Sequence, residues 1–375
     1  MSIMINILKY RNSNKTPIGL DMGHASIKMI QMEEAEDRLA VYAADSVEFD
    51  PDIKADQRRE FIVKTIREMV EKGNFRGREV VVSISNSDLK LKNLRVDSIE
   101  EEELQTLIHQ EVAAQLGLDP EKDEIRYLVA GKVHHSGELK NEVIFMGAGS
   151  DTIKANIDML IEAGVSPVGI DPVSNALQRS FVRSLRRQSD QTQVNFYIDI
   201  GSLYTTVLIG SNRQIHFIKQ IPIAGDRFNT EVASELDISI GEAAILRSKI
   251  QQGQNESINA ATKQAVVDAM TLSIEELAHE VSLCSRYYAV TFRGKRPERV
   301  FLAVGEAYEN ALSIALKKKL DMEMEISSPL KGLDISRTGK VLDPESPLCE
   351  WSVATGLSLK GCDLIQYTQE NHERN

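Results

Sequence analysis

Two stretches of this chain repeat one short pattern, and the repeat limits the folds that the chain can adopt. In Pro17–Met32 and again in Asn195–Gly210, an apolar strand-like run leads into Asp-x-Gly, a small or polar turn and a second strand-like run. Asp21 and Asp199, which open the two Asp-x-Gly sequences, lie about 180 residues apart, roughly the length of one domain. The spacing predicts a duplicated chain in which each half opens with a hairpin.

Each hairpin has the chemistry of a phosphate-binding turn. Glycine has no side chain, so the backbone N–H groups of the turn can approach an anion closely. A carboxylate just before such a turn can hold Mg²⁺ through water. Either hairpin alone is more typical of an ordinary β-turn. Two copies at this spacing, each followed by strands and helices, favour a pair of turns that grip a nucleotide phosphate chain from both sides.

Length and composition agree with a soluble protein of two domains. A chain of 375 residues exceeds the usual size of one core, and its apolar fraction of 42% is typical of globular proteins. The net charge of −12 argues against a nucleic-acid-binding surface. No apolar run reaches the roughly 20 residues of a membrane span, and residues 1–8 lack the features of a signal peptide. Three cysteines without paired spacing indicate a reducing, cytoplasmic compartment.

Hydrophobic periodicity in the first half predicts strands and helices around an insertion. After the first hairpin we expect a strand at 39–49, a helix at 56–72 and a strand at 79–85. Residues 88–171 are predicted to form an inserted α+β module, with a helix opened by the capping box Ser98-x-x-Glu101. Asp171-Pro172 predicts the next helix start, with Asp as N-cap and Pro at the first helical position. The polar stretch 188–193 predicts an interdomain hinge.

The second half repeats this plan. Its hairpin is followed by a strand at 214–223, a helix to 236, and a helix opened by a second capping box, Ser239-x-x-Glu242. A long amphipathic helix at 262–291, a strand at 300–304 and a helix to 320 follow. We therefore predict an N-terminal segment 1–16, a first lobe 17–190 that includes the inserted subdomain, a second lobe 191–365 and a disordered tail 366–375.

In this order the motifs resemble the PilM family of type IV pilus assembly proteins, within the actin/Hsp70/sugar-kinase superfamily. They run in the family's order over nearly the whole chain and read G-L-D-M-G-H-A-S-I-K, L-R-V-D-S-I-E-E-E-E-L, G-I-D-P-V-S-N-A-L, Y-I-D-I-G-S-L-Y-T-T-V, I-P-I-A-G-D-R-F, A-A-I-L-R-S-K and A-T-G-L-S-L-K-G. The resemblance implies an α/β, two-lobed actin-like ATPase fold of duplicated ribonuclease-H-like domains. It also implies that the insert is the α+β subdomain of the FtsA type, in the first lobe.

The resemblance further implies a site for ATP or ADP with Mg²⁺ between the lobes. Asp21 and Asp199 would hold the metal through water. The first phosphate loop would contain Gly23, His24, Ala25 and Ser26, followed by Lys28. The second phosphate loop would contain Gly201, Ser202, Thr205 and Thr206, with Gly225 and Asp226 near the phosphates. The nucleoside would be approached by Glu242, Lys249 and the adenosine loop Gly305, Glu306 and Ala307.

Two departures from the family pattern bear on hydrolysis. Relatives have a run of glycines in the adenosine loop, where this chain has Val304 before Gly305 and Glu306. They have small serines in the first loop, where this chain has His24 and Ala25. The chain is therefore at most a weak ATPase, or a pseudo-ATPase. Glu111 is the one candidate that the family pattern suggests for orienting water, and an exposed helix glutamate is the competing interpretation.

The function implied is a nucleotide-binding scaffold of type IV pilus or related secretion-system assembly. It would be cytoplasmic and peripheral to the inner membrane. Its partners would be the cytoplasmic N-terminal peptide of a PilN-like protein and other pilus-assembly proteins, and self-association is a further possibility. The peptide groove would lie between the inserted subdomain and the first lobe, with walls at 89–94 and 104–116. Two alternatives are a small-molecule kinase, for which the sequence has no catalytic Asp motif, and an FtsA-like division protein, against which the polar 366–375 argues.

Overall fold

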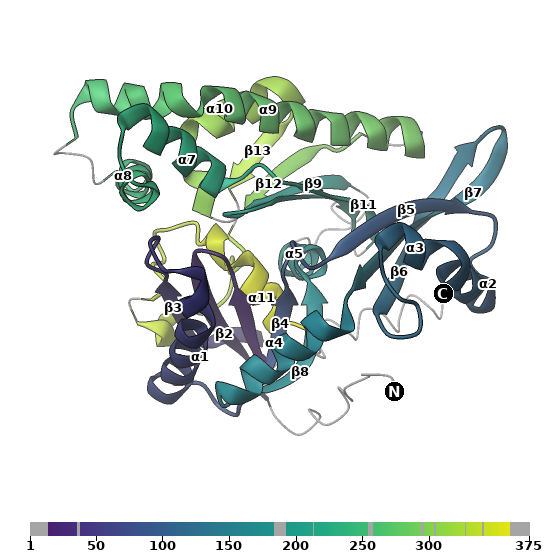
Figure 1. The fold of residues 1–375 in the computed structure, drawn as a ribbon, viewed down its shortest axis with the longest axis horizontal. Helices are drawn as coiled ribbons and strands as arrows, with labels where there is room; N and C mark the ends of the chain where they lie inside the picture. Colours follow the sequence, from purple (N-terminus) through teal and green to yellow (C-terminus); the bar gives the residue numbers. More distant parts are fainter. Residues whose placement is uncertain are drawn as a thin grey trace.

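Three sheets and the helices between and around them make up the structure (Figure 1). The computed structural model describes residues 14–35, 38–183, 193–212, 214–253, 258–293, 296–303, 305–326, 328–339 and 341–360. Residues 188–192 of the predicted hinge 188–193, the tail 366–375 and Val304 lie outside these ranges. Within them, no helix is both long and apolar enough to cross a bilayer.

The first and second sheets have the same topology, which confirms the predicted duplication. In each, a central strand pairs antiparallel with the next strand of its hairpin and parallel with a later strand, and a fifth strand continues the sheet in parallel. The first sheet has the order β3-β2-β1-β4-β8, formed by β1 (Ile18–Met22), β2 (Ser26–Ala35), β3 (Arg38–Glu48), β4 (Glu79–Ile84) and β8 (Ser166–Pro172). The second has the order β11-β10-β9-β12-β13, formed by β9 (Val194–Ile200), β10 (Thr205–Ser211), β11 (Gln214–Ile221), β12 (Arg299–Ala303) and β13 (Glu323–Ile326).

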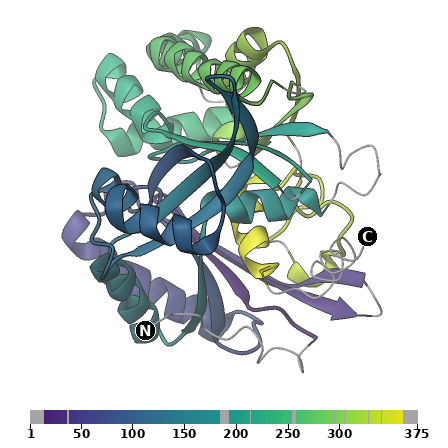
Figure 2. The ribbon, with the colours of Figure 1, turned by 90° about the vertical axis from the view of Figure 1, so that its right-hand side faces the viewer.

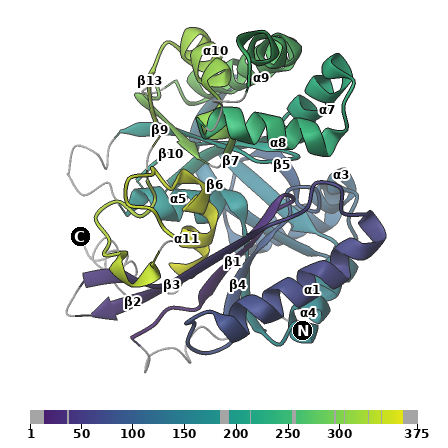
Figure 3. The same cartoon turned by 90° about the vertical axis from the view of Figure 1, so that its left-hand side faces the viewer.

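Both central sheets are covered on two faces, and the alternation of apolar side chains shows how. In β9, Phe196 and Ile198 pack under the long helix α9 (Ala260–Phe292), whereas Tyr197 between them stacks on Phe181 of α5 (Val173–Val182). In the first sheet, helices α1 (Ala55–Lys72) and α4 (Ser150–Glu162) cover the outer face (Figure 3). Because strands buried on both faces carry continuous apolar runs, they could be recognised from sequence.

The second lobe places three further helices around its sheet. They are α7 (Gly225–Leu236), α8 (Ile240–Gln251) and α10 (Asn310–Leu320), and α10 packs beside α9 (Figures 1 and 3). The capping box predicted at Ser239 is present: its hydroxyl accepts from the N–H of Glu242, and the Glu242 carboxylate accepts from the N–H of Ser239. Two backbone N–H groups at the start of the helix are thereby satisfied locally.

The inserted module projects beside the two lobes as a three-stranded sheet with one interrupted helix (Figures 1 and 2). Its strands, in the order β5-β7-β6, are β5 (Lys90–Val96), β6 (Glu124–His135) and β7 (Glu138–Ala148). The helix runs through α2 (Glu101–Leu107), a π-helical turn (Ile108–Val112) and α3 (Ala113–Leu116). β8, which we had included in the module, instead pairs with β4 in the first sheet, and α4 packs beside it.

Two predicted helix starts are wrong. The capping box at Ser98 does not form: Glu100 is the N-cap of α2, and the Ser98 hydroxyl accepts from the N–H of Glu100 in a local turn instead. Helix α5 begins at Val173 rather than after Asp171. The Asp171 carboxylate is buried and pairs with Arg179 at 2.8 Å and Lys360 at 2.9 Å, so tertiary ion pairing replaces the local cap.

Helix α11 (Ser352–Ser358) comes late in the chain and packs on the first sheet, although its residues fall within the range 191–365 that we assigned to the second lobe. Together with α5 it lies between the two large sheets (Figure 1). The packing is extremely close. A Cβ on Gly356 would lie 1.8 Å from the carbonyl oxygen of Ala176 in α5, and one on Gly19 in β1 would lie 2.1 Å from that of Ala354.

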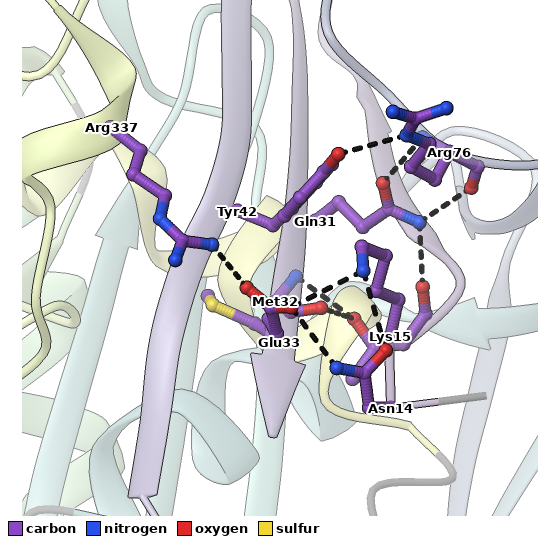
Figure 4. Close-up of polar contacts among 9 residues, drawn as sticks. Asn14, Lys15, Gln31, Met32, Glu33, Tyr42, Arg76 and Arg337 are labelled. Atoms are coloured by element: carbon purple, nitrogen blue, oxygen red, sulfur yellow. Dashed lines mark hydrogen bonds and ion pairs between the residues drawn. The ribbon is translucent and has the colours of Figure 1, made fainter. Parts of the chain in front are cut away.

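A polar cluster fixes two other chain segments to the first sheet (Figure 4). Glu33 of β2 accepts hydrogen bonds from Asn14 at 3.0 Å and Lys15 at 3.2 Å, and it pairs with Arg337 from the segment before α11. Burial alone would raise the pKa of Glu33, but the two cations together lower it. Residues 14–16 thus extend the sheet beyond β1, and Lys15 pairs with Glu33 in an antiparallel bridge.

The contact between α11 and α5 makes a prediction for stability. Replacing Gly356 with Ala puts a methyl group against the backbone of Ala176, so we expect the free energy of unfolding to fall by about 3 kcal/mol. Chemical denaturation followed by circular dichroism measures the change. Gly169→Ala in β8 is the matched control, because the nearest atoms to its Cβ are 3.6 Å away, and it should stay within about 0.5 kcal/mol of wild type. Equal stability of both variants would contradict the packing described.

Candidate functional site

Two carboxylates, that of Asp199 buried and that of Asp21 partly buried, lie at equivalent ends of the central strands of the two lobes. Asp21 is in β1 and Asp199 is in β9. Burial raises the pKa of Asp199 to about 7, with a further contribution from the negative charge of Asp21, while Lys28 acts in the opposite direction. Burial also raises the pKa of Asp21. The structure therefore brings together three residues that the sequence analysis assigned to one site, across the interface of the lobes.

The turn after each carboxylate leaves little room for a side chain on its glycine. In the second hairpin, the N–H of Gly201 donates to the carbonyl of Tyr204 at 3.1 Å, and a Cβ on Gly201 would lie 3.2 Å from that oxygen. In the first hairpin, a Cβ on Gly23 would lie 2.9 Å from the carbonyl oxygen of Ser26. A side chain would therefore crowd both turns, Gly23 more than Gly201. Without a side chain, the backbone of each turn can approach an anion closely.

Helix α7 begins against the second turn. The N–H of Gly225 donates to the carbonyl of Gly201 at 3.0 Å, and the N–H of Asp226 donates to that of Ser202 at 2.8 Å. The start of a helix carries partial positive charge, which favours a phosphate nearby. The Asp226 carboxylate lies 3.4 Å from the imidazole Nε2 of His24, so the first turn of one lobe contacts the start of α7 in the other.

The remaining residues of the two loops differ in what they contact. Lys28 donates to the hydroxyl of Ser26 at 2.6 Å. Ala25 is exposed, and its carbonyl accepts from the N–H of Phe49 at 2.8 Å. The hydroxyl of Thr205 donates to the carbonyl of Ile223 at 2.7 Å, so it serves the second lobe internally.

Arg58 of α1 supports the first turn from behind. Its guanidinium donates to the carbonyls of His24 and Gly23, the latter at 3.3 Å, and it lies over the ring of Phe49 at 4.6 Å from the ring centre. Burial and the positive charge of Arg58 lower the pKa of His24, whereas Asp226 raises it. The guanidinium of Arg58 therefore holds the first turn in place through its two carbonyl groups.

Sequence reasoning missed Arg247, the most buried cation beside this site. Its guanidinium donates to the carbonyl of Gly225 at 3.2 Å and to the side chain of Asn229 at 2.7 Å, and it pairs with the carboxylate of Glu306. Only 3% of its side-chain surface is exposed. Arg247 thus ties the start of α7 to the segment after β12. The signal was present in A-A-I-L-R-S-K, where an arginine stands between apolar residues of a helix.

Glu242, Lys249 and Glu111 lie on exposed surfaces. Glu242 is used as the cap of α8, and Lys249 is exposed on the same helix. Glu111 is exposed in the π-helical turn of the inserted module, where its carboxylate accepts from the side chain of Gln115. A Cβ on Gly305 would meet no atom within 4 Å, so this glycine borders open space. The side chain of Ala307 lies outside the described residues.

The donor set of the site fits a magnesium-bound phosphate better than a metal held by protein alone. Within the described ranges, no group of three or more His, Cys, Asp and Glu residues could hold a metal. Mg²⁺ commonly takes one or two carboxylates and completes its shell with phosphate oxygens and water. Asp199 Oδ1 is buried without a hydrogen-bond partner, and such an oxygen is satisfied by a hydrated cation.

Comparisons with known proteins agree with this architecture. The family model for "Type IV pilus assembly protein PilM" matches residues 19–362. No curated protein sequence matches the chain. The solved "PilM-PilN type IV pilus biogenesis complex" contains a chain with a TM-score of 0.75 and 19% identity, over 92% of this chain and 98% of that one. Ethanolamine utilization protein EutJ from Carboxydothermus hydrogenoformans has a TM-score of 0.52 and 14% identity, over 92% and 89%. These structures confirm the two-lobed, actin-like α/β fold.

The raised pKa of Asp199 makes a prediction for the metal-free protein. A buried carboxyl with a pKa near 7, against an ordinary value of 3.8, favours folding below about pH 4, and this contribution is lost as the pH rises through 7. Asp199→Asn has no such loss. We therefore compare the free energy of unfolding of Asp199→Asn with that of wild type at pH 4 and at pH 8, both in chelator. The variant minus wild-type difference should be larger at pH 8 than at pH 4, by on the order of a few kcal/mol.

Denaturant titrations at several pH values measure this difference. Asp158→Asn, at an exposed position on α4, is the control and should show the same pH dependence as wild type. A pH-independent difference for Asp199→Asn would show that this carboxyl ionises normally in the folded protein.

Proposed function

Since the chain belongs to the PilM family of type IV pilus assembly proteins, we propose that it is a nucleotide-binding scaffold at the cytoplasmic face of the inner membrane. It would bind the cytoplasmic N-terminal segment of a membrane partner similar to PilN, the protein named in the matching complex. The observation that carries the nucleotide part is the close pair Asp21 and Asp199, each followed by a glycine turn with little room for a side chain.

Different residues of the cleft would bind the metal, the phosphates and the base of MgATP or MgADP. Asp21 and Asp199 would hold the hydrated Mg²⁺, which supplies the positive charge that the phosphates and the two carboxylates require. N–H groups of the two turns that are not bonded within the protein would face the phosphates. The start of α7 would contribute its partial positive charge, because the N–H groups of Gly225 and Asp226 already donate to the second turn. Gly305 borders open space where a base would lie, and Arg247 fixes Glu306 beside it.

A scaffold fits this cleft better than an efficient ATPase. Hydrolysis needs a group that orients water beside the terminal phosphate. The sequence candidate, Glu111, belongs to the inserted module, is exposed, and has its carboxylate bonded to Gln115. Asp226 faces the first turn but is paired with His24. We therefore expect occupancy by nucleotide with little turnover.

A cavity beside the inserted module suits an extended peptide. It has a volume of about 470 Å³ and lies between β5 with the end of α3 on one side and β11 on the other. Its walls include three leucines from the predicted groove, Leu89, Leu91 and Leu116. The opposite wall belongs to the second lobe, whereas the sequence analysis placed it in the first. The remaining lining is rich in side-chain amides: Asn86, Asn93, Gln115 and Gln220.

Two features of this cavity favour a partner backbone as the ligand. β5 is the edge strand of its sheet, so the backbone groups on its outer side are not used within that sheet. An extended segment can add to such an edge through main-chain hydrogen bonds. Amide side chains both donate and accept, so they match the alternating N–H and C=O groups of a peptide. The apolar leucines would then receive alternate side chains of the partner.

Calorimetry with MgATP tests the nucleotide part. We expect wild type to bind and Asp199→Ala to lose at least tenfold in affinity, roughly 1.4 kcal/mol, because one of two metal-holding carboxylates is removed. Glu111→Gln is the control and should bind as wild type does. The same samples should release phosphate slowly. Absence of binding by the wild type would refute the nucleotide proposal, and rapid turnover would refute the scaffold.

Peptide titration tests the partner part. A labelled peptide from the cytoplasmic N-terminus of a PilN-like protein of the same organism should bind the wild type. Leu91→Ser, which removes an apolar wall of the cavity, should weaken binding at least fivefold, on the order of 1 kcal/mol. Leu139→Ser alters an exposed leucine in β7 of the same module and serves as control. Equal affinity of both variants would place the peptide elsewhere.

A further inference from the structure

Asn86 connects the candidate nucleotide site with the cavity beside the inserted module. It lies in the connection between β4 and β5, and its side chain lines the cavity. Its amide nitrogen donates to the hydroxyl of Thr206 at 2.9 Å. Its amide oxygen accepts from the side chain of Gln220 at 2.9 Å. One side chain of the first-lobe connection therefore contacts two strands of the second lobe.

Thr206 stands on the cleft side of the second hairpin. It lies directly opposite Asp199 in the β9–β10 ladder, and residues directly opposite each other point to the same face of a sheet. Thr206 is 1% exposed and Asp199 is 5% exposed. Since the hydroxyl of Thr206 already accepts from Asn86, any change that draws this hydroxyl toward the cleft alters the bond to Asn86.

The same connection also begins beside the first carboxylate. Ser83 of β4 donates to Asp21 at 3.3 Å. Three residues later the chain reaches Asn86, and Leu89 and Leu91 of the following segment line the cavity. Residues 83–91 are thus linked to both carboxylates of the site. Ser83 binds Asp21, and Asn86 binds Thr206, which lies opposite Asp199.

The inserted module is fastened more firmly to the second lobe than this connection alone requires. Ala130 and Ile144 of the module share one hydrophobic core with Leu208 and Ile218. The imidazole of His216 in β11 contacts the carbonyl of Ala130 at 2.7 Å. The same core also holds Ile84 of β4 and Phe181 of α5, so a shift of one lobe against the other would reach both connections between the first lobe and the module. Of these two, the β4–β5 connection is the one that carries Asn86.

We propose that Asn86 is a positioning residue that couples nucleotide binding in the cleft to the conformation of the cavity along β5. The proposal rests on the proposed function and adds a regulatory link between its two sites. In one state the amide of Asn86 binds Thr206 and Gln220; in the other it is released to a peptide backbone in the cavity. Because linkage is reciprocal, a nucleotide that disturbs Thr206 changes the cavity, and an occupied cavity changes nucleotide affinity by the same factor.

Hydrogen–deuterium exchange of the full chain tests the link without a partner. Calorimetry first establishes saturating MgADP for each variant, so differences in affinity do not enter the comparison. In wild type, MgADP should change the exchange rates of amides in β5 by at least about fivefold, the lower end of typical couplings. Asn86→Leu should abolish this change. Asn93→Leu, which alters another amide of the cavity wall, should retain it.

Each outcome decides the proposal. A response of β5 that persists in Asn86→Leu overturns it, and so does wild type that binds MgADP without any response of β5. If calorimetry shows no MgADP binding, the proposed nucleotide function fails and the link fails with it. Gln220→Leu removes the hydrogen bond from Gln220 to Asn86. It provides the same test should Asn86→Leu not fold. Its response should be lost as well.

Discussion

The structure depends on two like charges that folding brings close together in a buried cleft. Asp21 and Asp199 each lie at an equivalent end of a central strand, and burial and their mutual repulsion raise the pKa of Asp199 to about 7. A hydrophobic core would not tolerate this pair without compensation. Lys28 compensates in part. The remaining need for positive charge explains why the glycine turns, the start of α7 and an unpartnered carboxylate oxygen converge on one place.

The two lobes can bring these carboxylates together because small residues let α5 and α11 lie between the sheets. A side chain at position 356 would clash with the backbone of α5, and a side chain at Gly19 of β1 would clash with the backbone of α11. The bidentate group of Arg179 binds both Asp171 and the carbonyl of Gly356, which fastens α11 to the end of β8. The position of Asp21 is therefore set by a helix that lies more than three hundred residues later in the sequence.

This distance explains what the sequence could and could not predict. The duplicated hairpins and the buried strands follow from short-range patterns, and they are found as expected. Identical capping signals at Ser98 and Ser239 had different outcomes, because a cap depends on where tertiary contacts let the helix begin. Asp171 became an ion-pair partner for the same reason. Arg247 was missed because a buried cation is recognised by its partners, and Gly225 and Glu306 come from distant segments.

His24 and Ala25 of the first turn are exposed, and the His24 imidazole contacts Asp226 at the start of α7. Glu306, in the predicted adenosine loop, is paired with Arg247, which neutralises its charge within the protein. The pair Asp21 and Asp199 is costly, because burial and the negative charge of Asp21 oppose ionisation of Asp199. A chain that had lost all need for a cation and phosphate would gain stability by replacing Asp199, so the persistence of this costly pair favours an occupied cleft over an empty fold.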